Sequence, residues 1–234
     1  MNLITFLSGH KKELGGVLDF DYHNNKSVIL DLSSGNKDLT SINIADAEKF
    51  TAYIKKILKE KNAAYAIGKY NEDRYIYNHS NLFSGNERRT IHLGIDLFAD
   101  ENTKVICPFN GKIHSFNNNK GIGDYGPTII IEHTLDNVKF YTLYGHLSLE
   151  SLNNTKINQM IKKGDIIGAI GNSIVNGHWP PHLHFQIIKD MLGKTGDFPG
   201  VASKNEREKF LDLCPDPNLI LQINNLKLQY HTLD

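Results

Sequence analysis

The chain has 234 residues, 40% of them hydrophobic, and its 26 basic residues balance its 26 acidic ones. This length allows one large domain or a main domain with a smaller companion. A formal charge of zero argues against the broad basic surface that binds nucleic acid or an anionic membrane, so we expect neither as a partner.

Residues 1–11 contain only a short apolar run without a basic lead, and no later segment is apolar enough to cross a bilayer. We therefore expect a cytoplasmic protein, or a periplasmic or secreted one if an export signal has been removed. Cys107 and Cys214 lie far apart in the sequence. They lack the close pairing of a zinc knuckle or a redox pair, and we interpret them as buried free thiols.

Residues 1–84 are predicted to form a small α+β unit. A strand is expected over residues 27–32, and a helix over residues 47–59, where apolar side chains share one stripe and Asp46 can cap the first turn. Two further strands, residues 64–70 and 74–77, are predicted to form a hairpin.

Residues 85–190 are rich in short β-like runs separated by turns. This spacing predicts a mainly β domain, an antiparallel sandwich or a barrel-like sheet. The runs cover residues 104–107, 111–116, 128–133, 138–147, 164–170 and 182–188. In residues 191–234 we expect a helix that starts near Ser203 and Glu206 and ends at Leu213, followed by a strand-like tail over residues 218–230, both packed on the main domain.

The most informative segment is Pro181-His182-Leu183-His184-Phe185. Successive side chains of a strand alternate between its two faces, so His182 and His184 lie on the same face. Two neighbouring imidazoles are costly to bury without a metal ion or hydrogen-bond partners.

Two upstream segments carry further candidate ligands. His92 and Asp96 occur in His-Leu-Gly-Ile-Asp, whose flanking isoleucines favour an extended backbone, and Gly94 between them can let the backbone pass close to a metal. His146 ends the run 138–147, where strand alternation places it on one face with Thr142 and Tyr144. A catalytic zinc ion typically has three protein ligands drawn from these residue types and one open position.

The other polar candidates have simpler structural explanations. His133 ends an apolar strand and is expected to pack or to hydrogen-bond, whereas His114 and His178 are expected at a strand edge and in a loop. Arg88 and Arg89 are expected to be solvated. The sequence contains neither the strand-to-helix context of a phosphate loop nor a serine nucleophile elbow.

The ordered set His92, Asp96, His146, His182 and His184 resembles the lysostaphin/LytM-type zinc metalloendopeptidases, which cleave peptidoglycan and have a duplicated hybrid motif fold. Residues 124–126 and 163–168 also resemble the pattern of that family. The resemblance covers roughly residues 88–190. Two positions depart from the pattern: Asn102 stands in place of a glycine, and Gln186 in place of an acidic residue.

This resemblance implies that His92, Asp96 and His184 bind one Zn²⁺ ion and that His146 and His182 are the catalytic pair, without indicating which of the pair is the general base. It implies a zinc metallopeptidase whose substrate is a peptide of the peptidoglycan stem or cross-bridge. Two alternatives remain open: a cytosolic zinc hydrolase of a small peptide or amide, and a noncatalytic module that binds murein or activates a partner enzyme.

Overall fold

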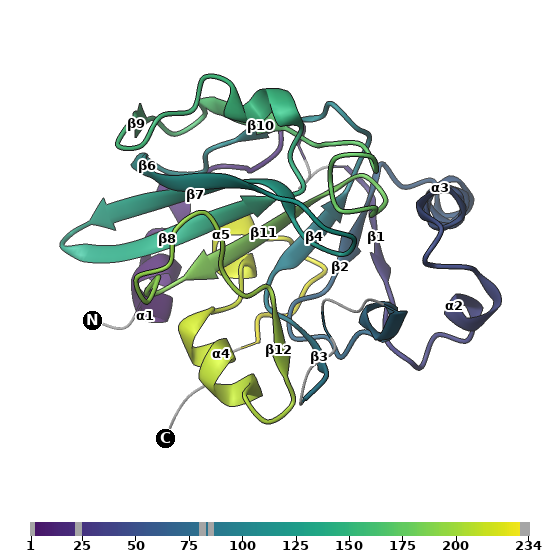
Figure 1. The fold of residues 1–234 in the computed structure, drawn as a ribbon. Coiled ribbons are helices and arrows are strands. Elements are labelled where there is room, and N and C mark those ends of the chain that lie inside the picture. The colour runs from purple at the N-terminus through teal and green to yellow at the C-terminus, as the bar shows by residue number, and fades with distance from the viewer. Residues whose placement is uncertain (1–2, 22–24, 80–82, 84–86, 230–234) are drawn as a thin grey trace.

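The computed structural model describes residues 3–21, 25–79, 83 and 87–229. Eight of the strands in these residues build one large sheet with the strand order β1-β2-β4-β11-β8-β7-β6-β9 (Figure 1). Its strands are β1 Ser27–Leu30, β2 Tyr65–Gly68, β4 Ile95–Phe98, β6 Gly111–Asn119, β7 Gly126–Leu135, β8 Val138–Gly145, β9 Met160–Ile161 and β11 His182–Ile188. All neighbouring pairs are antiparallel except β1 with β2. The predicted mainly β, antiparallel fold is confirmed.

Two small sheets flank the large one. The strands β5 Lys104–Ile106 and β10 Ile166–Ala169 form one pair, and β3 Arg89–His92 and β12 Val201–Ser203 form the other. The helices lie outside the sheets and are α1 Leu3–Gly9, α2 Asp38–Ser41, α3 Ala47–Lys61, α4 Arg207–Leu213, α5 Asn218–Leu221 and the short 3-10 helices Lys11–Glu13, Tyr75–His79 and Leu149–Leu152. Among the described residues, no helix combines the length and apolar character needed to cross a membrane.

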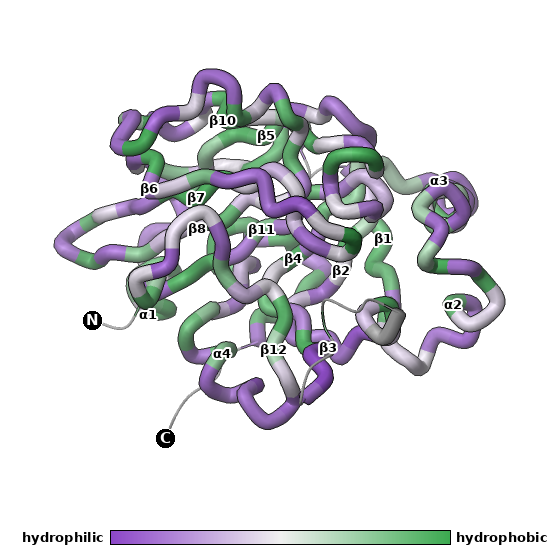
Figure 2. Tube along the Cα trace, viewed as in Figure 1, coloured by the Kyte–Doolittle hydropathy of each residue, from purple (hydrophilic) through white to green (hydrophobic). Residues whose placement is uncertain are grey.

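The main core forms where the apolar faces of the central strands meet the flanking helices. Hydrophobic residues concentrate along these strands, and hydrophilic ones along the surrounding loops (Figure 2). Leu97, Leu143, Leu183 and Phe185 are fully buried. Such burial stabilises by roughly 1.5–3 kcal/mol per large apolar side chain, which holds the central strands in a fixed register.

The N-terminal residues join this sheet through β2, which pairs with β4 along the edge that carries Asp96. The helix α3 begins as expected, because the Asp46 side chain accepts hydrogen bonds from the backbone N–H groups of Glu48 and Lys49. The division into units at residues 1–84, 85–190 and 191–234 stays a prediction, although the strands of the first unit belong to the same sheet as those of the second.

Two local predictions are wrong. The second strand of the expected hairpin does not form. Residues 71–74 bond to β3 instead, because Asn71 N–H donates to the His92 carbonyl and Arg74 N–H donates to the Thr90 carbonyl. A 3-10 helix follows at Tyr75–His79. The tail 218–229 begins with the helix α5 rather than a strand, because Asp216 Oδ1 accepts from the Asn218 N–H at 2.8 Å. Residue 230, the last of the predicted tail strand, lies outside the described residues.

Other details agree with expectation. Cys107 and Cys214 are buried free thiols. Asn102, at the position where the resembling family has a glycine, has a φ of +67°. Asparagine adopts this left-handed region more readily than most residues, so the turn before β5 is kept without glycine.

Candidate metal centre

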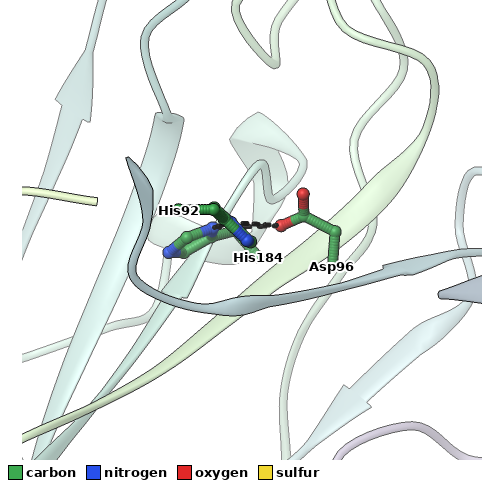
Figure 3. Close-up of side chains that lie close together, drawn as sticks. All are labelled: His92, Asp96 and His184. Carbon is green, nitrogen blue, oxygen red and sulfur yellow. Dashed lines mark hydrogen bonds and ion pairs between the residues drawn. The ribbon is translucent and has the colours of Figure 1, made fainter. Parts of the chain in front are cut away.

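Three of the predicted residues converge where β3 meets the central strands β4 and β11 of the large sheet. His92 ends β3, Asp96 lies on β4, and His184 lies on β11 directly opposite Asp96 in the strand register. All three side chains are buried. Figure 3 shows one carboxylate oxygen of Asp96 turned toward the imidazole nitrogens and the other turned away.

The three facing atoms form a tight triangle. His92 Nε2 lies 3.0 Å from His184 Nδ1, and Asp96 Oδ1 lies 3.0 Å from His184 Nδ1 and 3.3 Å from His92 Nε2. Tetrahedral zinc with bonds of about 2.1 Å spaces its ligand atoms by about 3.4 Å. The observed triangle is therefore close to the size that zinc requires.

Hydrogen bonding leaves lone pairs inside this triangle. His92 Nδ1 lies 2.8 Å from the Lys69 carbonyl, which can only accept, so this nitrogen carries the proton and Nε2 does not. His184 Nε2 donates to Gln186 Oε1 at 2.9 Å, because the Gln186 amide nitrogen is already directed at the Pro199 carbonyl. His184 Nδ1 is therefore also unprotonated. Two lone pairs and a carboxylate oxygen face one another, an arrangement that a bound cation would stabilise.

Gly94 lies between His92 and Asp96 in the sequence and makes room for His184. A Cβ atom at this position would lie 2.5 Å from His184 Cε1 and 2.8 Å from the Phe185 carbonyl oxygen. The backbone thus passes directly against the His184 ring, in agreement with the close approach expected at this glycine.

The other two predicted histidines form a second cluster, which we call the imidazole pair. The ring centroids of His146 and His182 are 4.2 Å apart, and His182 Nε2 lies 3.9 Å from Asp96 Oδ1. Each Nδ1 donates to a backbone carbonyl, His146 to Asn176 O at 2.8 Å and His182 to Pro180 O at 2.7 Å. Each Nε2 therefore keeps a lone pair.

The sequence predicted that strand alternation orients His146. The structure shows that a turn after the strand does so instead. Strand β8 ends at Gly145, and His146 has a φ of +63°, a conformation that is uncommon for any residue other than glycine. Its N–H bonds to the Tyr125 carbonyl at 2.8 Å, which anchors the turn. The turn, rather than the pleat of β8, therefore sets the direction of the His146 ring.

Burial keeps the histidines His92, His146 and His182 neutral. It lowers the pKa of His92 to about 3. It also lowers the pKa of His182, and it lowers the pKa of His146 well below the usual histidine value. Burial alone would raise the pKa of Asp96, but the neighbouring His92 and Arg74 outweigh it and hold that pKa well below the usual range. Neutral imidazoles next to an ionised carboxylate are the protonation states that a metal ion needs.

Arg74 is a residue of the site that the sequence analysis missed. Its guanidinium is 1% exposed and donates through Nη1 to Asp96 Oδ2, the oxygen that faces away from the imidazoles. It lies in the segment 71–74, which was interpreted as part of a hairpin, and no local motif marks it. Gln186, noted as a departure from the family pattern, holds His184 with its amide oxygen where an acidic residue would offer a carboxylate.

The remaining sequence candidates are not part of the triangle of His92, Asp96 and His184, although Arg89 lines the same cavity. His133 is buried and bonds to Asn110 O and Thr142 Oγ1, as expected of a packing histidine. His114 bonds to the neighbouring Ser115 hydroxyl on β6. Arg89 lies over the ring of Phe83, with its guanidinium carbon 5.5 Å from the ring centroid, and is only half-buried.

The comparisons with known proteins cover this part of the chain. Residues 90–196 match peptidase family M23. The L-Ala--D-Glu endopeptidase of Bacillus subtilis (strain 168) is 30% identical over 107 residues, which are 44% of this chain and 31% of that protein. The chain therefore spans less than a third of the length of this curated relative. The expected resemblance to the lysostaphin/LytM-type peptidases is confirmed over the matched residues.

Parts of two solved structures are similar to this chain in sequence. The catalytic domain of the antimicrobial peptidase lysostaphin from Staphylococcus simulans is 28% identical, with a TM-score of 0.36, and the match covers 49% of this chain and 76% of that domain. A zinc containing peptidase from Vibrio cholerae is also 28% identical, with a TM-score of 0.34, over 43% of this chain and 28% of that one.

Proposed function

Starting from the match of residues 90–196 to peptidase family M23, we propose that this chain is a zinc-dependent peptidase that hydrolyses peptide bonds in peptidoglycan stem or cross-bridge peptides. The observation that carries the proposal is the triangle of His92 Nε2, Asp96 Oδ1 and His184 Nδ1, with sides of 3.0–3.3 Å. The L-Ala--D-Glu endopeptidase among the relatives supports the choice of a cell-wall peptide.

The proposed ligands are His92, Asp96 and His184, and the proposed catalytic residues are His146 and His182. Bound zinc would supply a Lewis acid that polarises the scissile carbonyl and makes water more acidic. The imidazole pair would do the proton transfers. One neutral Nε2 takes a proton from the attacking water as its oxygen bonds to the carbonyl carbon, and this proton then passes to the leaving amine as the C–N bond breaks.

The second member of the pair would stabilise the negative charge that develops on the carbonyl oxygen only when its Nε2 carries a proton, because an unprotonated Nε2 presents a lone pair to that oxygen. Both imidazoles are held in place by backbone carbonyls rather than by charged side chains. Their Nε2 atoms are therefore oriented before substrate arrives, at little reorganisation cost during the reaction.

A second candidate function, hydrolysis of a small peptide or amide, is favoured by the cavity above the site. The cavity has a volume of about 300 Å³, and aromatic side chains form much of its wall. Phe50, Tyr77 and Phe83 precede the residues that match the peptidase family, whereas Phe98 and Trp179 lie within them. Charged side chains, among them Arg89, Lys194 and Asp197, line the same cavity, so it offers a compact substrate both apolar and ionic contacts.

Peptide release from purified cell wall, measured with and without a chelator, tests the proposal. We expect the zinc-loaded protein to release peptides, and the chelator to stop the release until zinc is added back. A zinc-loaded protein that leaves cell wall intact but cleaves short synthetic peptides with an apolar residue would replace the first candidate with the second. A folded protein that cleaves neither would contradict both.

A further inference from the structure

We propose that Arg74 is a positioning residue of the metal centre. It holds Asp96 so that only one carboxylate oxygen binds the metal, and it bonds to the backbone carbonyl that orients His92. This inference rests on the proposed zinc site. It concerns a part of the chain that precedes the residues matched to the peptidase family, which begin at residue 90. The metal centre would then extend into the N-terminal residues.

The first step is the contact with Asp96. Arg74 Nη1 donates to Asp96 Oδ2, while Asp96 Oδ1 faces His92 and His184. Both side chains of this ion pair are almost inaccessible to solvent, at 1% and 4% exposure. A buried guanidinium on one oxygen prevents the carboxylate from turning both oxygens toward the same ion.

The second step is the link to His92. Arg74 Nη2 donates to the Lys69 carbonyl at 3.3 Å, and the same carbonyl accepts from His92 Nδ1 at 2.8 Å. The Arg74 guanidinium therefore contacts the proposed ligand Asp96 directly, and it contacts the Lys69 carbonyl that orients the proposed ligand His92. The segment that carries Arg74 also bonds to β3, because His92 N donates to Glu72 O at 3.0 Å.

The third step is the compensation of the Arg74 charge. Glu72 Oε2 accepts from Arg74 Nε at 3.2 Å, and Tyr77 OH accepts from Nη1 at 3.0 Å. Glu72 Oε1 accepts from the Leu32 N–H and pairs with Lys69 Nζ, both at 3.2 Å. A buried charge needs such partners, and here they fix the guanidinium on several sides.

The backbone is shaped to admit the guanidinium. Gly68 on β2 pairs with Asp96 on β4, and a Cβ atom at Gly68 would lie 2.5 Å from Arg74 Nη2 and 3.3 Å from Asp96 Cβ. Any side chain at residue 68 would displace Arg74 from the outer oxygen of Asp96. Gly68, Glu72 and Arg74 thus form one support for the ligand triangle.

The test compares wild type with Arg74→Met and Arg74→Lys in zinc affinity, measured by competition with a chromophoric chelator, and in the visible spectrum of the cobalt-substituted protein. We expect Arg74→Met to weaken zinc binding by about 10- to 100-fold, the usual effect of losing a group that orients a ligand. The freed carboxylate should bind through both oxygens, so the cobalt absorption should weaken as the coordination number rises. Arg74→Lys should restore part of the affinity.

Arg207→Met is the control, because Arg207 also bonds to a glutamate, Glu208, and through Asn71 to the same segment as Arg74, but contacts none of the three proposed ligands. It should leave the zinc affinity and the cobalt spectrum unchanged. Circular dichroism separates folding from metal binding, and Arg74→Lys serves if Arg74→Met does not fold.

Folded Arg74 variants with wild-type zinc affinity and cobalt spectrum would overturn the inference while leaving the proposed function intact. A folded wild-type protein that binds no zinc would instead overturn the proposed function, and the inference with it.

Discussion

The ligand triangle and the imidazole pair contain the same residue type at similar burial, yet they are built differently. In the triangle the Lys69 backbone carbonyl holds His92, the Gln186 amide holds His184 and the buried Arg74 guanidinium holds Asp96, and the facing atoms are 3.0–3.3 Å apart. The pair is held by two backbone carbonyls, and its rings have centroids 4.2 Å apart. The arrangement of the triangle suits a fixed cation. The arrangement of the pair suits two neutral imidazoles that take up and release protons during the reaction.

The largest expected effect breaks the triangle. His184→Ala removes one of three proposed ligands, so we expect zinc affinity to fall by more than about 100-fold and peptide hydrolysis to be lost with it. Metal content after gel filtration and peptide release measure the two effects. His114→Ala, a histidine change on β6 outside the site, should alter neither. Full zinc retention in the His184 variant would reverse the assignment of the two histidines on β11.

The next effect breaks the pair and leaves the triangle intact. His146→Gln and His182→Gln should each lower kcat by about 10²–10⁴-fold, the range of general acid–base catalysis, while zinc content stays at the wild-type level. Steady-state kinetics and metal analysis on the same preparations check this separation. Loss of zinc in either variant would show that the two clusters are not distinct.

A smaller effect is expected from a change at Gly94, whose backbone lies between the proposed ligands His92 and Asp96. Gly94→Ala places a Cβ against the His184 ring and the Phe185 carbonyl, so we expect a loss of about 1–3 kcal/mol in unfolding free energy and weaker zinc binding. Gly9→Ala is a matched control, since no atom lies within 4 Å of its added Cβ. Denaturant titration with and without zinc measures both. A Gly94→Ala variant as stable as the control would contradict the close approach.

The effect that bears least on the site concerns His133, a buried histidine outside both clusters. Burial lowers the pKa of His133 to about 4, so between pH 6.5 and 4 the unfolded chain binds a proton that the folded chain does not. Stability of the zinc-free protein should therefore fall as the pH falls through this window, with a contribution from His133 of about 3 kcal/mol. His133→Gln should flatten the dependence in denaturant titrations. An unchanged slope would contradict the assignment.

The sequence was sufficient where a feature is local. The alternation in residues 182–188 predicted a buried strand with two histidines on one face, and the Asp46 cap predicted the start of α3. All five site residues named from the sequence lie within one region of the structure. Their assignment as ligands and catalytic residues stays a proposal.

Features that depend on distant pairing could not be predicted. Arg74 reaches the site because residues 71–74 bond to β3 instead of forming a hairpin, and that choice depends on tertiary hydrogen bonds. His146 is turned by a positive φ that the sequence does not indicate, because histidine lacks the conformational freedom of glycine. In both cases packing of the whole sheet outweighed local propensity.

The most direct test of the account is a titration of the metal-free wild-type protein with zinc, followed by X-ray absorption at the zinc edge. The account predicts one zinc ion per chain, with two imidazole nitrogens and one carboxylate oxygen among its ligands. A folded protein that binds no zinc, or that binds it through other residues, would contradict it.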